Sequence, residues 1–443
     1  MTLEDDAINL HRLLKGKIEI QSRISVENVF DEGFGHDGGK EKNSLDEKEI
    51  NVKGTLGLIY TPGVAYVAES IGKNKELAYD YTSKWNNVAI VCDGTRVLGL
   101  GNIGPEAAIP VMEGKSILFK MLGGINAYPL CISSHDKEDI ISFIKMIQPV
   151  FGAINVEDIE SPKVLEIVER LQKELPIPVF HDDQHGTAVI TLAALINALR
   201  LLNKRLEEAR IVVAGAGSAG YGIFKILLHA GCRDFIVTDS HGAIYQGRDS
   251  DMKYENRQEE TTKLERNGYR DKDISTTGTR YKLEIAKKTN PSRLSGRLEE
   301  VIRGADVFIG VSGKGNLLTQ QMVRSMNHDA IVFALSNPDP EILPPDALQA
   351  GARIVATGRS DFANQVNNAL VFPSVLRALL DTRARLLDEE MLVAVGCAIA
   401  SLVEDTQLRE DSIIPKVNDA RILPVVIRTI KEAIQKHMET KLS

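Results

Sequence analysis

The sequence has little of what secreted, membrane-spanning or nucleic-acid-binding proteins require. Its 4 cysteines are spread over 443 residues without any CxxC spacing, at Cys92, Cys131, Cys232 and Cys397. We therefore expect free thiols, with neither a disulfide framework nor a zinc site. No apolar run reaches the roughly 18 residues that span a bilayer, and the first residues lack the basic and apolar regions of a secretory signal. These absences predict a cytoplasmic protein that does not bind a membrane.

Positive charge is also scarce. Lys and Arg number 53 against 61 Asp and Glu, which gives a formal net charge of −8. A surface that binds nucleic acid concentrates Lys and Arg, so we expect no nucleic-acid partner. What the chain does have is length and an ordinary composition, with 43% hydrophobic residues. Two domains with large buried cores are therefore expected.

From Leu56 onward, short β-rich runs alternate with helix-like segments, which predicts an α/β fold with largely parallel sheets. Strands are expected at 87–91, 97–100, 150–156, 177–180, 211–214, 234–238, 306–311, 330–335 and 353–356. We predict an N-terminal α/β domain over residues 1–186. A doubly wound Rossmann-type dinucleotide-binding domain with C-terminal helices follows over 187–443. The charge-rich stretch at about 249–280 is interpreted as a surface insertion.

Two pairs of adjacent carboxylates each end a strand-like run. Glu157-Asp158 follows Ala153 to Val156, and Asp182-Asp183 lies within Phe180 to Thr187, flanked by His181 and His185. Adjacent carboxylates repel each other, so a cation that neutralises them makes the pairs easier to accommodate. Together they offer hard oxygen ligands for Mg²⁺ or Mn²⁺. The alternative is that each pair only caps a following helix.

A glycine-rich turn, Gly215-Ala216-Gly217-Ser218-Ala219-Gly220, lies between a predicted strand and a predicted helix. In this context it indicates a dinucleotide site rather than a purely structural turn, because the helix N-terminus can face a pyrophosphate. Asp239 ends the next strand, where it would bind the adenosine ribose and repel a 2′-phosphate. Ser240, His241 and Arg248 are close enough in sequence to form a compensating phosphate pocket, so NAD is only narrowly preferred over NADP.

Several polar residues are candidates for acid–base chemistry or substrate binding. Tyr60 precedes a Pro-Gly turn, and Lys115 follows Gly114 inside an apolar stretch. Packing for the tyrosine and solvation for the lysine are the ordinary alternatives. Arg96 has the planar fork that clamps a carboxylate. Asn337 ends a strand of the dinucleotide domain, and Asn367 precedes another apolar run.

Taken together, these motifs resemble malic enzyme, in a short bacterial-type form. The resemblance rests on segments in the same order and at similar spacing, namely Tyr60 to Ala65, Asp93 to Gly101, Val156 to Ile159, Phe180 to Thr187, Gly215 to Gly220, Ser336 to Pro338 and Asn367-Asn368. It implies oxidative decarboxylation of L-malate to pyruvate and CO₂, with reduction of NAD(P)⁺ and dependence on Mn²⁺ or Mg²⁺. At least a homodimer is also implied.

The resemblance also implies a role for each candidate. The metal ligands would be Glu157, Asp158 and Asp183, with His181 and His185 as supporting residues. Lys115 and Tyr60 would be the acid–base pair, with Asp182 orienting Lys115. The substrate carboxylates would be held by Arg96, Asn337 and Asn367. The cofactor would contact Gly215, Gly217, Ser218, Ala219, Gly220, Asp239, Ser312 and Asn337.

Three other functions remain open from the sequence. A malolactic-type enzyme would use nearly the same residues but retain its cofactor and release lactate. An amino-acid dehydrogenase with a similar two-domain plan would need no metal. A non-catalytic nucleotide-binding regulator is disfavoured, because Tyr60, Lys115, Asp182 and Asp183 are all present.

Overall fold

The computed structural model describes residues 60, 63–248 and 275–442, and the chain divides into two compact units, Met1–Trp85 and Asn86–Ser443. The described part of the first unit is helical, with α4 (Gly63–Lys73), the short turn η1 (Lys75–Leu77) and α5 (Ala78–Tyr81); η2 (Ser83–Asn86) follows. None of the residues of α4 is buried. Both sheets of the protein described below lie in the second unit.

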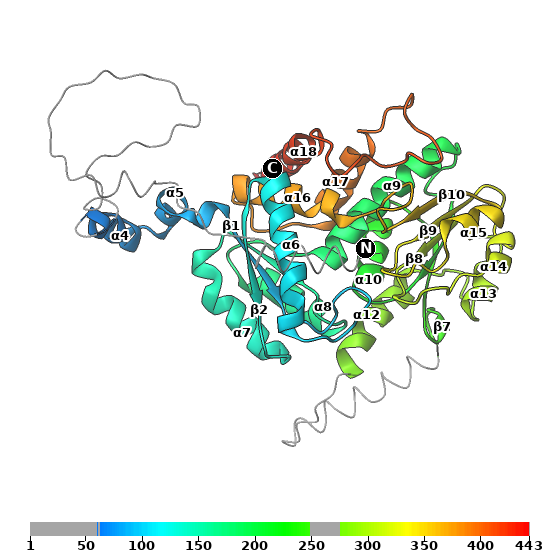
Figure 1. Ribbon diagram of the computed structural model, residues 1–443, viewed down its shortest axis with the longest axis horizontal. Coiled ribbons are helices and arrows are strands. Elements are labelled where there is room, and N and C mark those ends of the chain that lie inside the picture. Colours follow the sequence, from blue (N-terminus) through cyan, green and yellow to red (C-terminus); the bar gives the residue numbers. More distant parts are fainter. Residues whose placement is uncertain (1–59, 61–62, 249–274, 443) are drawn as a thin grey trace, which may run out of the picture. The chain divides into compact units, whose positions relative to one another are not determined.

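The first sheet is parallel, with the strand order β2-β1-β3-β4. Its strands are β1 (Asn87–Cys92), β2 (Asn126–Cys131), β3 (Ala153–Glu157) and β4 (Val179–His181). Every residue of β1 and β3 is buried, as expected for inner strands that are covered on both faces. The connecting helices are α6 (Pro105–Gly123), α7 (Lys137–Ile147) and α8 (Lys163–Glu174), with the short turn η3 (Gln148–Val150) after α7. Figure 1 shows α6 lying along β1 and β2, beside α16.

The second sheet has the order β10-β9-β8-β5-β6-β7, parallel except for the short strand β7. Its strands are β5 (Arg210–Ala214), β6 (Asp234–Asp239), β7 (Gly242–Ala243), β8 (Val307–Gly310), β9 (Ala330–Ala334) and β10 (Ala352–Thr357). Its helices are α10 (Ser218–His229), α12 (Ser275–Lys288), α13 (Leu298–Val301), α14 (Gln320–Arg324) and α15 (Pro344–Gln349). The strand order reverses between β5 and β8. In a doubly wound sheet, this is the point at which ligands bind.

Further helices contribute to a hydrophobic core that also includes residues of both sheets. They are α9 (Thr187–Leu201), α16 (Phe372–Thr382), α17 (Glu389–Ala400) and α18 (Ile422–Leu442), with the short turn η5 (Asn368–Leu370) before α16. In α9 apolar residues face every direction, and the helix packs against α10 and α17 (Figure 1). An all-round apolar helix is stable only when it is covered on all sides. In the described part of the chain, no helix is long and apolar enough to cross a membrane.

The α/β fold class with a Rossmann-type sheet is confirmed, but the strand predicted at 97–100 is wrong. There the chain forms a turn that closes with a single bridge between Val97 and Gly101. Leu98 has a φ of 49°, which a strand does not allow, and it is 57% exposed. Most of the predicted insertion, residues 249–274, lies outside the described residues, and its end at 275–280 begins helix α12.

Candidate active site

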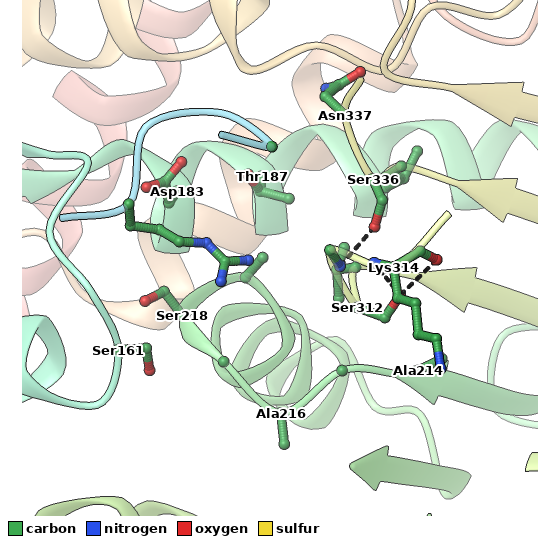
Figure 2. Close-up of a pocket in the computed structure, with 18 of the residues that line it drawn as sticks. Ser161, Asp183, Thr187, Ala214, Ala216, Ser218, Ser312, Lys314, Ser336 and Asn337 are labelled. Carbon is green, nitrogen blue, oxygen red and sulfur yellow. Dashed lines mark hydrogen bonds between the residues drawn. The ribbon is translucent and has the colours of Figure 1, made fainter. Parts of the chain in front are cut away.

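A cleft of about 1430 Å³ lies where the carboxyl ends of both sheets face each other. Its first wall includes Arg96, Lys115, Glu157, Asp158 and Asp183. Its second wall includes Gly215, Gly217, Ser218, Ala219, Asp239, Ser312, Ser336, Asn337 and Asn367. Figure 2 shows Asp183 and Thr187 on one side of this cleft, with Ser312, Ser336 and Asn337 opposite. The cleft therefore contains most of the residues that the sequence singled out.

Glu157, Asp158 and Asp183 form one cluster, with one carboxylate oxygen of each within 4.8 Å of the others. Glu157 is the last residue of β3 and Asp158 follows with a left-handed φ of 49°. Asp183 belongs to η4 (Asp182–Gly186), the π-helical turn after β4, which is the neighbour of β3 in the sheet. Parallel strands that end side by side thus bring together carboxylates that are distant in sequence.

The negative charges of Glu157 and Asp158 are destabilised by their surroundings. Burial, together with the nearby charge of Asp183, raises the pKa of Asp158 to about 8. Burial also raises the pKa of Glu157 well above its usual value, even though Lys115 opposes the shift. A divalent cation bound to these hard oxygen donors would stabilise the charged forms of Glu157 and Asp158. The donor set therefore fits Mg²⁺ or Mn²⁺.

Lys115 projects from α6 into the same cluster. Its Nζ donates a hydrogen bond to Oε1 of Glu157 and another, of 2.6 Å, to Oδ2 of Asp182. Burial alone would lower the pKa of Lys115, but the charges of Asp182 and Glu157 outweigh it and raise the pKa. Asp182 is 0% exposed. The hydrogen bond shows that Asp182 faces Lys115, whereas its neighbour Asp183 belongs to the acidic cluster.

The two histidines that flank the aspartates stay outside the cluster of oxygen ligands. Nδ1 of His185 accepts a hydrogen bond of 3.2 Å from the backbone N–H of His181. Burial lowers the pKa of His185 to about 3, so this ring is neutral at physiological pH. Nε2 of His181 lies 3.7 Å from Oδ2 of Asp183. Neither histidine belongs to the cluster of carboxylate oxygens that the described residues form.

The predicted substrate residues approach the cleft from three loops. Arg96 follows β1, and its backbone N–H donates to the carbonyl of Asp158 at 3.1 Å. Its loop is held by the buried Asp93, which accepts a 2.8 Å hydrogen bond from Lys163. Asn337 follows β9 and is exposed in the cleft. The Asn367 side-chain oxygen caps η5 by accepting from the Ala369 N–H at 2.9 Å, which leaves the Asn367 amide NH₂ to donate.

Tyr60, the remaining acid–base candidate, belongs to the other unit of the chain, Met1–Trp85. Its side chain is 68% exposed. A tyrosine hydroxyl that faces solvent is accessible for acid–base chemistry.

The glycine-rich turn has the geometry of a dinucleotide loop. Gly215 follows β5 with a φ of 119°, a conformation that other residues rarely adopt. A Cβ at Gly220 would lie 1.9 Å from the Gly215 carbonyl oxygen, so only glycine allows this helix to approach the strand. Helix α10 then begins with Ser218 and Ala219. No side chain caps its first N–H groups, because the residue before it is Gly217. These free N–H groups are suited to bind a phosphate.

Asp239 is not a free acceptor. Arg248 binds it in a bidentate manner at 3.0 and 2.9 Å, Lys282 donates at 2.8 Å and the His241 N–H donates at 2.8 Å. Burial by itself would raise the pKa of Asp239, but these donors outweigh it and lower the pKa to about 2. A carboxylate has about four lone-pair sites, and four donors occupy them. Sequence reasoning named Arg248 but missed Lys282, which α12 brings in from beyond the charge-rich segment.

Ser312 follows β8, and both its N–H and its hydroxyl bind the carboxylate of Glu341, at 2.9 and 2.8 Å. Glu341 was also missed, because it lies in a proline-rich turn, Asp339-Pro340-Glu341, that carries no recognised motif. No local signal distinguishes Glu341, because Asp339 is an acid that lies even closer to Ser336-Asn337-Pro338.

Comparison with known proteins gives consistent results over nearly the whole chain. The family described as "Malic enzyme, N-terminal domain" matches residues 40–172, and "Malic enzyme, NAD binding domain" matches residues 184–435. The chain is 46% identical to a bifunctional malic/malolactic enzyme of Bacillus subtilis, over 98% of this chain and 93% of that protein. It is 47% identical to an NAD-dependent malic enzyme of Geobacillus stearothermophilus, over 93% and 80%. The crystal structure of an NAD-dependent malic enzyme from Thermotoga maritima has a TM-score of 0.80 at 42% identity, over 96% of this chain and 98% of that one.

Proposed function

The chain belongs to the malic enzyme family, and we propose that its cleft converts L-malate and NAD⁺ to pyruvate, CO₂ and NADH with the help of a divalent ion. The observation that carries this proposal is the cluster at the ends of β3 and β4. There Lys115 is bonded to Glu157 and Asp182 beside a set of three carboxylates. The glycine-rich turn borders the same cleft. A base, a metal-ligand set and a dinucleotide loop are the parts that this reaction needs.

We place the division between the two functional domains at residues 186 and 187. The N-terminal domain, 1–186, supplies the metal and substrate groups, and 187–443 supplies the dinucleotide site. The limits of the two family matches, ending at 172 and beginning at 184, support this placement.

In the proposed oxidation step, Lys115 takes the proton of the malate C2 hydroxyl as hydride leaves C2 for the nicotinamide. Asp182 holds the lysine in place through its 2.6 Å hydrogen bond. Glu157, Asp158 and Asp183 would hold a divalent ion, which would supply positive charge to polarise the substrate. The charge of Lys115 depends on Asp182 first and then on Glu157 and Asp183, because all three raise its pKa. A cation that neutralises Glu157 and Asp183 would therefore favour the base form of Lys115.

In the proposed second step, the C2 ketone accepts the electron pair left by the C4 carboxylate as CO₂ departs. Tyr60 then protonates C3 of the enolpyruvate, which gives pyruvate. Arg96, Asn337 and the amide of Asn367 would hold the two malate carboxylates. Arg96 is best suited to this, because its guanidinium offers parallel N–H donors in a planar fork.

NAD⁺ is the proposed acceptor, by a narrow margin. Asp239 at the end of β6 supports it, because a carboxylate repels a 2′-phosphate. The pairing of Asp239 with Arg248 and Lys282 weakens that support, since the two cations more than balance its charge. Steady-state kcat/KM values with NAD⁺ and with NADP⁺ decide between them. We also propose at least a homodimer, on the family resemblance, which light scattering of the purified protein would test.

The function itself is tested by incubating the purified protein with L-malate, Mn²⁺ and either cofactor. We expect equal amounts of pyruvate and reduced nicotinamide; the absence of both products refutes the proposal. The name of the Bacillus subtilis relative favours malolactic conversion as the second candidate. That reaction would release lactate without net NADH, so measuring lactate separates the two. Activity that survives exhaustive chelation would instead favour a metal-free dehydrogenase.

A further inference from the structure

Glu341 is a buried carboxylate that joins two loops of the candidate active site. It lies between β9 and α15 and is 0% exposed. Its Oε1 accepts hydrogen bonds from the Ser312 N–H at 2.9 Å, the Ser312 hydroxyl at 2.8 Å and the Ser336 hydroxyl at 2.5 Å. Its Oε2 accepts a longer one, 3.3 Å, from the Ser336 N–H. One side chain therefore binds the loop after β8 and the loop after β9 together.

A further hydrogen bond links these two loops directly. The Gly313 N–H donates to the Ser336 hydroxyl oxygen at 2.8 Å, drawn as a dashed line in Figure 2. The hydroxyl of Ser336 can accept from Gly313 and donate to Glu341 at the same time. The result is a chain of hydrogen bonds from one loop to the other through Ser336.

The backbone makes room for this carboxylate. Gly310 is the last residue of β8, and a Cβ there would lie 2.4 Å from Cδ of Glu341. Each carboxylate oxygen of Glu341 accepts a backbone N–H, which can only donate, so both oxygens must act as acceptors. The neutral side chain of Gln has the same shape but only one acceptor oxygen, so it cannot accept from both backbone N–H groups.

We propose that Glu341 is a positioning residue for the reaction, which sets the loops after β8 and β9 so that Ser312 meets the cofactor and Asn337 meets the malate. This inference rests on the proposed function. β8 and β9 are neighbouring parallel strands, and the dinucleotide binds at the carboxyl ends of such strands. Because Asn337 directly follows Ser336, any shift of Ser336 also moves Asn337.

The opposite end of β8 offers a matched control. Asp306 precedes β8 and accepts hydrogen bonds from the Arg210 N–H at 3.0 Å and the Lys204 Nζ at 2.8 Å. Asp306 links neighbouring segments as Glu341 does, but at the amino end of β8, away from the cleft. Asp306→Asn should therefore lower stability without disturbing the cofactor loops.

The test compares Glu341→Gln with Asp306→Asn. In Glu341→Gln one backbone N–H must face the amide NH₂, so we expect kcat/KM for malate to fall by about 10- to 100-fold. NADH binding, followed by fluorescence titration, should weaken as well. The Mn²⁺ concentration for half-maximal activity should not change, because Glu157, Asp158 and Asp183 belong to the other sheet. Asp306→Asn should retain normal kcat/KM and NADH affinity at a lower melting temperature.

Normal kcat/KM and normal NADH affinity in Glu341→Gln would overturn the inference. Parallel losses in both variants would also overturn it, because they would show a merely structural role. If Glu341→Gln does not fold, Ser336→Ala replaces it, with a smaller loss expected in the same direction and normal kinetics counting against the inference. A wild-type protein that binds NADH without oxidising malate would refute the proposed function, and the NADH titrations would still decide the role of Glu341.

Discussion

The Nζ of Lys115 donates a 2.6 Å hydrogen bond to Oδ2 of Asp182, which is 67 residues away along the chain. The two residues come from α6 and η4, on separate segments of the first sheet domain. The lysine also faces the ring of Phe372, with its Nζ 4.9 Å from the ring centroid. Hydrogen bonds and an aromatic wall thus hold this amine in one place at the edge of the acidic cluster.

This arrangement predicts a large loss of turnover when the amine is removed. In Lys115→Ala, malate-dependent NADH formation should fall by about 10²- to 10⁴-fold, the usual contribution of a positioned acid–base group. Lys120→Ala is the matched control, because Lys120 is on the same helix but exposed. Near-normal turnover in folded Lys115→Ala protein would refute the assignment of the base.

Metal binding should be measurable without any assay of activity. Mn²⁺ should raise the melting temperature of the wild-type protein, because a ligand that binds only the native state stabilises it. Asp183→Asn should reduce that rise, since one of the three clustered carboxylates loses its charge. Asp405→Asn, which changes a carboxylate that is 88% exposed, should respond to Mn²⁺ like the wild type. An equal rise in all three proteins would mean that the ion binds elsewhere.

Cofactor preference should respond to Lys282. In Lys282→Ala, Asp239 regains an acceptor site for the ribose hydroxyl, and the pocket loses a positive charge that would attract a 2′-phosphate. We expect the ratio of kcat/KM for NAD⁺ over NADP⁺ to rise by about tenfold, the scale of one hydrogen bond to a charged group. Lys287→Ala, an exposed position on the same helix, should leave the ratio unchanged. A lower ratio in Lys282→Ala would show that Asp239 does not bind the ribose.

Stability in alkaline solution should depend on Cys232. Burial raises the pKa of this thiol from 9.0 to about 12 in the folded protein. The unfolded chain loses the proton near pH 9 and the folded chain keeps it, so stability is lost as pH rises through this interval. Chemical denaturation of Cys232→Ala should therefore show a flatter fall in the free energy of unfolding above pH 9. Rapid alkylation of Cys232 in the folded wild type at pH 8 would contradict this prediction.

Much of the fold was predictable, because a short and fully apolar run between turn residues usually forms a buried strand. The runs at 87–91 and 330–335 became the buried strands β1 and β9. The run at 97–100 failed because the chain turns there, with positive φ at Leu98 and Gly101, and leaves Leu98 and Leu100 exposed, at 57% and 65%. Apolar composition indicates a strand only where another element covers it, and a single sequence does not specify that cover.

The sequence by itself determined which residues end each strand and therefore which side chains reach the carboxyl edges of the sheets. Glu157-Asp158 and Asp182-Asp183 were identified in this way, as was the turn from Gly215 to Gly220. Only the tertiary structure decided which of the two adjacent residues, Asp182 and Asp183, contacts Lys115 and which joins the acidic cluster. Successive residues of the tight turn η4 point in different directions, so one meets Lys115 and the other meets Glu157 and Asp158.

The tertiary structure also decided the partners that come from distant segments. Lys282 reaches Asp239 from α12, and Glu341 reaches Ser312 from the turn after β9. Neither contact has a local signature, because its free energy comes from pairing groups that only the folded chain brings together and shields from water. Local pattern therefore determined the candidates, and long-range packing determined what each of them binds.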